Sequence, residues 1–219
     1  MQRRAPALVR AVRASTGRPI VTYALIGVTI LVYIFQLLSN GWVTNNFAYV
    51  AALTAAEPWR MLTAIFLHAS PLHILLNMYS LFVIGPMLEG AIGRGRFLAL
   101  YLIAGFGGSV AVLLLAPDSV VIGASGAIFG LLGGLFVIQR KLGGNTTQLF
   151  IVIAINLAIG FVIPGLAWQA HLGGLLVGAA VGAVYLETRR IDQKWLQIGL
   201  IAAIGVALIA ASIVKILVF

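Results

Sequence analysis

Long apolar stretches with few polar positions inside them recur along the whole chain. Stretches of about 18 or more apolar residues are typical of helices that cross a bilayer. Seven segments fit this description, namely residues 20–39, 71–89, 97–116, 122–139, 148–166, 168–187 and 196–217. At about 1.5 Å per residue each is long enough for a hydrocarbon core of ~30 Å. The pattern therefore predicts an all-α membrane protein, a polytopic bundle of seven helices.

The composition supports this prediction. Apolar residues make up 62% of the 219-residue chain and charged residues only 9%, and the mean hydropathy is +1.10. Soluble domains carry about 25% charged residues because their surfaces face water. The chain also contains no cysteine, which excludes disulfides, thiolate catalysis and zinc–thiolate sites. We expect neither a cofactor nor a bound metal ion.

The basic residues predict the orientation of the helices. The chain has 14 Lys and Arg against 5 Asp and Glu, and all the basic residues except Arg60 and Lys215 lie in the N-terminal tail or in every second connection, which places them on one side of the membrane. This alternation follows the positive-inside rule and predicts a cytoplasmic N-terminus with a basic tail over residues 1–19. We interpret the first stretch as a retained helix because it is too long for a signal peptide and no small-x-small site follows it. The basic excess then calls for no nucleic-acid partner.

Residues 40–70 form the longest connection, and the alternation places it on the outer side. Residues 61–67 are too apolar for a loop in water, so we expect them to lie in the membrane interface. Trp59 is expected to be an interfacial anchor, and Arg60 a snorkelling or loop-pinning cation.

Polar side chains inside the stretches mark candidate functional positions, because burying them in lipid is costly. His73, Ser125 and His171 each lie about three residues into a stretch that runs from outside to inside, so they share a depth near the outer face. Asn77 follows His73 by four residues and shares its helix face. Asn156 has no identifiable partner, and we expect it to be structural.

Small residues recur at every fourth position in two of the stretches. The two ladders are Gly126, Gly130 and Gly134 in one, and Ala170, Gly174, Gly178 and Gly182 in the other. Such spacing lets two helix backbones approach closely in lipid, so we expect these helices to pack together. Ser125 precedes the first small residue of one ladder and His171 follows that of the other. The packing would bring hydroxyl and imidazole within reach.

A serine hydroxyl beside an imidazole supplies the minimal parts of an activated nucleophile. No carboxylate is expected at this depth, so the pair would act as a dyad rather than a triad. The backbone N–H of Ser125, the amide of Asn77 and the ring N–H of His73 are candidate donors to an oxyanion. Each residue alone also fits a helix cap or a hydrogen bond between helices. Their convergence at one depth favours catalysis.

These residues resemble the rhomboid intramembrane serine proteases. The matching segments are residues 57–60, 68–77, 123–130 and 170–174. The resemblance implies that Ser125 is the nucleophile, that His171 is the base, and that His73, Asn77 and the Ser125 amide stabilise the oxyanion. It covers residues 20–187, which we expect to form a six-helix protease core. A cytoplasmic linker and a seventh helix would follow over residues 188–219.

The resemblance also implies supporting roles. Gly123 would permit a close approach of the backbone beside the serine, Phe129 would stack on the histidine, and His68 would be structural or water-organising. Trp59 and Arg60 match the signature of the family's first outer loop, and Gly126 belongs to the matching segment around the serine.

The activity implied is that of a serine endopeptidase that cuts single-span transmembrane substrates near the outer face through an acyl-enzyme. Substrates would enter laterally, with the fifth helix as a gate and residues 162–168 as a cap. We expect a multi-pass protein of a prokaryotic plasma membrane, with its active site open to the extracytoplasmic side, since no transit peptide is recognisable. The sequence does not specify the substrate or the oligomeric state.

Two other functions remain open at this point. A proton-coupled transporter or channel could use histidines and an asparagine as a relay, although such sites lie near the midplane and often in repeats. A catalytically inactive membrane chaperone of the same fold would be expected to lack the serine or the histidine, and this chain has both.

Overall fold

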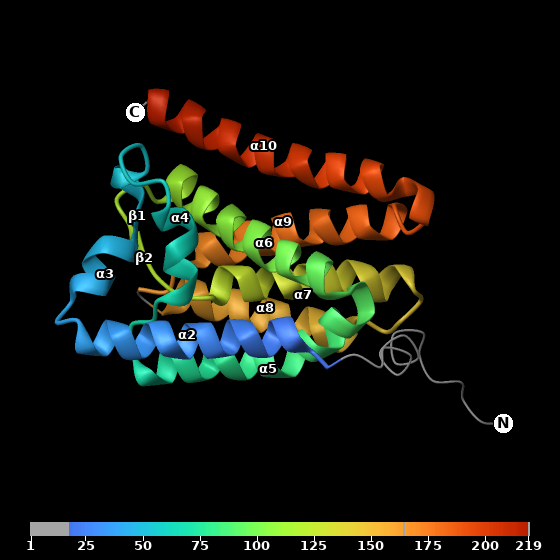
Figure 1. The fold of residues 1–219 in the computed structure, drawn as a ribbon, viewed down its shortest axis with the longest axis horizontal. Helices are drawn as coiled ribbons and strands as arrows, with labels where there is room; N and C mark the ends of the chain where they lie inside the picture. Colours follow the sequence, from blue (N-terminus) through green and yellow to red (C-terminus); the bar gives the residue numbers. More distant parts are fainter. Residues whose placement is uncertain (1–17, 164, 219) are drawn as a thin grey trace.

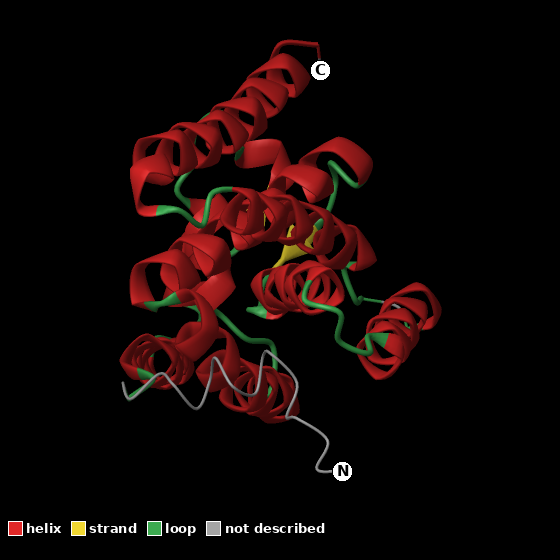
Figure 2. Ribbon diagram, turned by 90° about the vertical axis from the view of Figure 1, so that its right-hand side faces the viewer, coloured by secondary structure: helices red, strands yellow, loops and turns green. Residues whose placement is uncertain are grey.

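The computed structural model describes residues 18–163 and 165–218, and the basic tail expected over residues 1–19 lies almost wholly outside them (Figure 1). All seven predicted stretches are helical in this part of the chain. The long helices are α2 (Ile20–Leu38), α5 (Pro71–Ile92), α6 (Arg94–Leu115), α7 (Ser125–Lys141), α8 (Thr147–Val162), α9 (Trp168–Glu187) and α10 (Lys194–Val218). The helices run side by side, and Figure 2 views the bundle roughly along their axes. The chain is an integral, multi-pass membrane protein.

Among the described residues, two of the seven long helices are shorter than the 18 or more residues expected of a membrane span. Five are long and apolar enough to cross a membrane, whereas α7 has 17 residues and α8 has 16. Helix α7 spans only about 26 Å and starts at Ser125 rather than at residue 122, because the chain before it is extended. Non-helical backbone is tolerated at membrane depth where protein encloses it, and α7 lies among α5, α6 and α9.

The connection between α2 and α5, residues 39–70, is folded against the bundle and is named the outer connection after the side on which the sequence predicts it. It contains α3 (Trp42–Phe47), β1 (Tyr49–Val50), η1 (Ala51–Leu53), α4 (Arg60–Thr63) and η2 (Ala64–Phe66). Strand β1 pairs antiparallel with β2 (Val120–Val121), with Tyr49 opposite Val121 and Val50 opposite Val120. A second short element, η3 (Ile191–Gln193), precedes α10.

Most of residues 61–67, which were expected at the depth of the interface, are buried against the rest of the protein. Met61 and Leu67 are almost completely buried, and the Ser109 hydroxyl of α6 donates to the Met61 carbonyl over 2.7 Å. Arg60 pins the connection: its Nη1 donates to the carbonyls of Asn45 (2.7 Å) and Ala48 (3.0 Å), and it forms an ion pair with Glu57. The half-exposed Trp59 beside it suits an interfacial position.

Helices α7 and α9 pack together along the two predicted glycine ladders. A Cβ atom added to Gly174 would collide with the carbonyl of Gly126, and one added to Gly178 would collide with that of Gly130. At Gly182 it would lie 2.8 Å from the Cα of Gly134. The predicted backbone-to-backbone packing is confirmed, and it determines where the first turns of α7 and α9 lie.

Helix α2 is tied to α5 by a buried carboxylate. Glu89 Oε2 accepts hydrogen bonds from the Thr22 backbone N–H (2.8 Å) and hydroxyl (2.7 Å), and its other oxygen accepts from the Val21 N–H (3.0 Å). A carboxylate satisfies the free N–H groups and the positive dipole at a helix N-terminus. The start of α10 is held similarly, by Gln197, which bonds to Thr188 and to Arg96.

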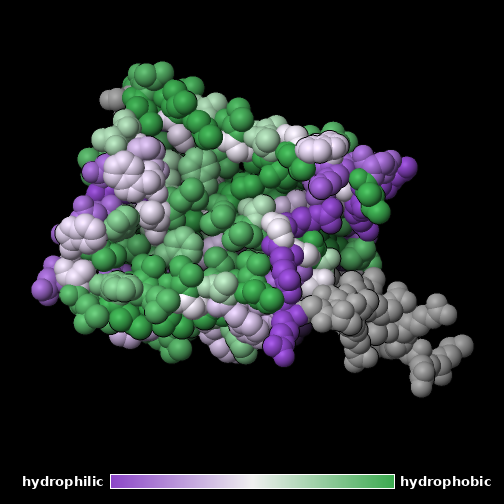
Figure 3. Space-filling view, viewed as in Figure 1, coloured by the Kyte–Doolittle hydropathy of each residue, from purple (hydrophilic) through white to green (hydrophobic). Residues whose placement is uncertain are grey.

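The basic connections lie at one end of the bundle. Figure 3 shows hydrophilic residues gathered at the end where α6 begins, beside a broad apolar face. The starts of α6 and α10 and the end of α7 all lie there (Figure 1). Ser125 and the β1–β2 pair lie towards the opposite end.

The packing of the two glycine ladders predicts that alanine destabilises the protein at a ladder glycine but not at a glycine without close neighbours. Gly178→Ala should lower the thermal unfolding temperature in detergent by about 5 °C, because overpacking costs about 1–3 kcal/mol. Gly199→Ala on α10 is the matched control, since nothing lies within 4 Å of its Cβ position. Equal unfolding temperatures for the two variants would contradict this account of the packing.

Candidate active site

Ser125 begins α7 directly after an extended segment that only glycine can complete. Gly123 has a φ of +129°, and a Cβ there would lie 2.8 Å from the imidazole of His73. Its backbone N–H donates to the carbonyl of Ala64 over 2.9 Å, which fastens the segment to the outer connection. The turn places the half-buried Ser125 at the N-terminus of α7, with Gly123 between it and His73.

His171 faces this serine from the first turn of α9. Its Nε2 lies 2.9 Å from Ser125 Oγ, within hydrogen-bond distance. The ring of Phe129 stacks on the imidazole with a centroid distance of 4.4 Å and an interplanar angle of 11°. His171 Nδ1 is buried and has no hydrogen-bond partner among the described residues. The imidazole is therefore oriented by ring stacking and helix packing rather than by a carboxylate.

The imidazole of His73 lies beside the segment that precedes Ser125. Its Nδ1 accepts a hydrogen bond from the Ala69 backbone N–H over 3.3 Å, so in the neutral ring the proton is on Nε2. That Nε2 is one of the atoms closest to the Cβ position of Gly123, next to Ser125. Asn77, one turn further along α5, donates one amide hydrogen to the His73 carbonyl over 2.9 Å. Its second amide hydrogen is left for another acceptor.

His68 lies behind His73 and is almost completely buried. The two imidazoles meet edge to face with their centroids 4.9 Å apart. Burial, with a further contribution from His73, lowers the pKa of His68 to about 4, so the ring is neutral at physiological pH. Its backbone is bracketed by Gln36 of α2, which accepts from the His68 N–H (3.1 Å) and donates to its carbonyl (2.9 Å).

Gln36 is the residue of this region that the sequence analysis missed. It joins α2 to the connection that carries His68, and its amide also donates to the Thr44 hydroxyl over 3.0 Å. The available signal was a lone amide inside an otherwise apolar stretch, which is costly in lipid unless it is paired.

The end of α8 and residues 162–168 border the site, with residue 164 outside the described part. Phe161 and Trp168 stack with a centroid distance of 4.4 Å. A cavity of about 330 Å³ separates these residues from β2, and Val121 and Gly160 contribute to its lining. A Cβ on Gly160 would lie 3.4 Å from His171 Nδ1, so α8 covers the histidine from this side.

Several predicted residues come together here and others do not. Ser125, His171, Phe129, Gly123 and His73 are contiguous, and Gly126 packs against the Ala170 carbonyl beside them. Trp59 and Arg60 act through the outer connection rather than on the serine. Asn156 lies on the exposed face of α8, where its amide donates to the Val152 carbonyl, in keeping with a structural residue.

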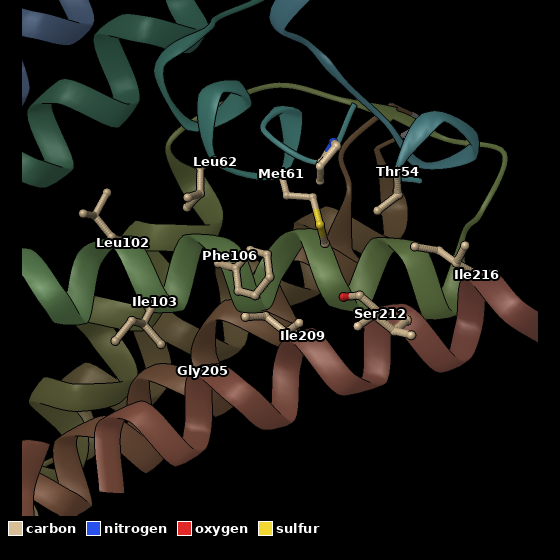
Figure 4. A pocket seen from close by; sticks show the side chains of 12 residues that line it. Thr54, Met61, Leu62, Leu102, Ile103, Phe106, Gly205, Ile209, Ser212 and Ile216 are labelled. Carbon is tan, nitrogen blue, oxygen red and sulfur yellow. The ribbon is translucent and has the colours of Figure 1, made fainter. Parts of the chain in front are cut away.

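A separate apolar cavity of about 510 Å³ lies between α6, α10 and the outer connection (Figure 4). Its two hydroxyls, from Thr54 and Ser212, donate to the backbone carbonyls of Ala51 and Leu208. It includes none of the residues around Ser125. Among the residues that the structure describes, no three His, Asp or Glu side chains come together in a way that could hold a metal ion.

Comparison with known proteins gives a consistent result. A family model described as the rhomboid domain matches residues 55–188. Rhomboid protease GluP of Bacillus subtilis (strain 168) is 38% identical over 174 residues, which cover 74% of this chain and 34% of GluP. Putative rhomboid protease YdcA of the same organism is 34% identical over 169 residues, covering 73% of this chain and 85% of YdcA.

RHOMBOID-like protein 6, mitochondrial, of Arabidopsis thaliana is 41% identical over 138 residues, covering 59% of this chain and 44% of the relative. The match thus spans less than half the length of GluP and of the plant protein, and most of YdcA. Because the domain match covers more than half of the chain and includes the Ser125 and His171 segments, the chain belongs to the rhomboid family.

Proposed function

We propose that the chain is an intramembrane serine endopeptidase in which Ser125 is the nucleophile and His171 the general base. The observation that carries this proposal is the 2.9 Å distance between His171 Nε2 and Ser125 Oγ, held by two glycine-packed helices. GluP is named as a rhomboid protease and YdcA as a putative one, which supports the same activity. The presence of both residues argues against an inactive relative.

In the proposed reaction His171 Nε2 takes the hydroxyl proton as Ser125 Oγ attacks the carbonyl carbon of the scissile bond. The tetrahedral intermediate collapses when the same proton passes to the leaving amine, which leaves an ester on Ser125. Water then attacks the ester with His171 again as base, and the acid product leaves. Nε2 can accept a proton only if Nδ1 carries the ring hydrogen, so the neutral imidazole must be the Nδ1–H tautomer.

Three donors are suited to the oxyanion of this intermediate. The Ser125 backbone N–H lies at the N-terminus of α7, where N–H groups lack helical partners and the dipole is positive. His73 Nε2–H and the second amide hydrogen of Asn77 approach from α5. Donors fixed in advance of the reaction stabilise the developing charge most effectively.

We further propose single-span membrane proteins as substrates, cut near the outer face of a prokaryotic plasma membrane. The basic end of the bundle, including the N-terminus, would face the cytoplasm, which places Ser125 near the outer side. Helix α8 would act as the gate and residues 162–168 as the cap. Helix α8 buries only Ile153 and Gly160, so displacing it exposes little core. Residues 20–187 would form the protease core, with residues 188–219 as an addition to it.

The dyad can be tested without a known substrate. A fluorophosphonate probe should label the wild-type protein, and Ser125→Ala and His171→Ala should abolish labelling, because both the nucleophile and its activation are required. Ser212→Ala, a buried serine on α10, is the control and should label normally. Labelling of Ser125→Ala at the wild-type level would place the reactive group elsewhere.

The stacking of Phe129 on His171 predicts that kcat depends on whether residue 129 carries an aromatic ring. Phe129→Leu should lower kcat between about 10- and 100-fold, since a small misorientation of the base is costly. Phe129→Tyr keeps the ring and should retain most of the rate. Turnover assays with a single-span substrate measure both. A higher KM at unchanged kcat would show that Phe129 does not position the base.

Shared oxyanion donors predict a partial defect at Asn77. Asn77→Ala should reduce kcat by about 10²-fold or less, because the Ser125 amide and His73 would still donate. Turnover is compared with that of Ser125→Ala in the same assay. An Asn77→Ala protein that is folded but as inactive as Ser125→Ala would contradict sharing among several donors.

A further inference from the structure

Gly160 brings the backbone of α8 directly against the first turn of α9. It is one of the two buried residues of α8, and the other, Ile153, lies about two turns earlier. A Cβ atom added to Gly160 would lie 3.2 Å from the Cβ of Trp168 and 3.4 Å from His171 Nδ1. Trp168 and His171 are three residues apart and share one face of α9. The glycine thus lies against the turn that carries the candidate base.

The contact involves the edge of His171 that faces away from Ser125. Nε2 lies 2.9 Å from Ser125 Oγ, whereas Nδ1 is buried and has no hydrogen-bond partner among the described residues. The proposed reaction needs the Nδ1–H tautomer, so this edge carries a donor without an acceptor. In a triad a carboxylate accepts from this atom and orients the imidazole. Here the backbone of α8 lies at the corresponding place.

Stacking alone leaves one movement of the imidazole unrestrained. The ring of Phe129 lies nearly parallel to that of His171, which limits tilting but not sliding within the plane. Sliding would change the distance from Nε2 to Ser125 Oγ, and close packing at the opposite edge resists it. Gly160 and Trp168 also line the neighbouring cavity of about 330 Å³, which His171 does not reach. The two residues therefore separate Nδ1 from that cavity.

We propose that Gly160 is a positioning residue for the base: it closes the Nδ1 edge of His171 and holds Nε2 at hydrogen-bond distance from Ser125. This inference rests on the proposed function. Glycine alone leaves the contact undisturbed, because with any Cβ atom at this position Trp168 or His171 would have to move by a few tenths of an ångström. A base displaced from its nucleophile slows the chemical step rather than substrate binding.

Alanine and serine at position 160 would displace the ring similarly but differ in hydrogen bonding. A serine inside a helix often donates its hydroxyl hydrogen to the carbonyl four residues earlier, here that of Asn156. Its oxygen is then left to accept from His171 Nδ1–H. Such an acceptor favours the required tautomer and stabilises the imidazolium, as a carboxylate does in a triad. A purely structural role for Gly160 would make the two variants equally slow.

The test uses the full chain in liposomes of fixed composition. The rate of labelling by a fluorophosphonate probe reports the reactivity of Ser125, and kcat and KM are measured with a single-span substrate. Gly160→Ala should lower the labelling rate and kcat about tenfold at unchanged KM, since a misplacement of about 1 Å can cost 10²-fold. Gly160→Ser should exceed Gly160→Ala about threefold or more in both rates, because the hydroxyl accepts from Nδ1–H.

Two control variants match these substitutions. Ala158→Ser adds a hydroxyl to an exposed position of α8. Gly199→Ala makes the same exchange on α10, where nothing lies within 4 Å of the Cβ position. Both should react at the wild-type rate. The thermal unfolding temperature of each variant in detergent establishes that it is folded.

Three outcomes would overturn the inference. The first is a Gly160→Ala protein that is labelled and turns over as fast as the wild type. The second is a Gly160→Ser protein as slow as Gly160→Ala, which marks a packing defect. The third is a higher KM at unchanged kcat, which places the effect on substrate binding. If the wild type is neither labelled nor able to cut the substrate, the proposed protease activity itself fails, and that result is distinct because it involves no substitution.

Discussion

The contact between the backbones of α7 and α9 is the constraint on which the rest of the structure depends. Glycine faces glycine at three successive turns, so the two helices lie closer than any side chain would allow. In lipid, apolar surface gains little by leaving its solvent, and close packing with small residues supplies the attraction between helices. The closeness fixes the first turns of both helices, and with them the separation of Ser125 from His171.

The outer connection supplies backbone hydrogen bonds to the extended segment before Ser125, which the helices alone do not provide. The extended chain before Ser125 would leave backbone groups unpaired at membrane depth, and β1 and the Ala64 carbonyl pair with it. Arg60 holds this connection through backbone carbonyls, and Gln36 holds it to α2 through the His68 backbone. The connection thus forms one wall of the site, which explains why Met61, Ile65 and Leu67 are buried against the protein.

Hydropathy predicted all seven helices, and the spacing of small residues predicted the pairing of α7 with α9, because both signals are local in the sequence. The start of α7 was wrong by three residues, since Ile122 and Ala124 of the segment before it are as apolar as the residues of a helix. The contacts of Gln36 and Glu89 were not predicted, because the partner of each lies far away in the sequence. The packing of residues 61–67 was likewise not predicted, because hydropathy measures how apolar a segment is and not what it packs against.

The absence of a carboxylate beside His171, among the described residues, shapes the proposed chemistry. In a triad the carboxylate fixes the tautomer of the histidine and stabilises the imidazolium. Here the Phe129 ring can fix the plane of the imidazole but offers no acceptor for Nδ1–H. The imidazolium formed during attack is then less stabilised, and the reaction depends more on donors at the oxyanion and on correct placement of substrate. Orientation of the base is thereby coupled to helix packing: whatever separates α7 from α9 also separates the base from the nucleophile.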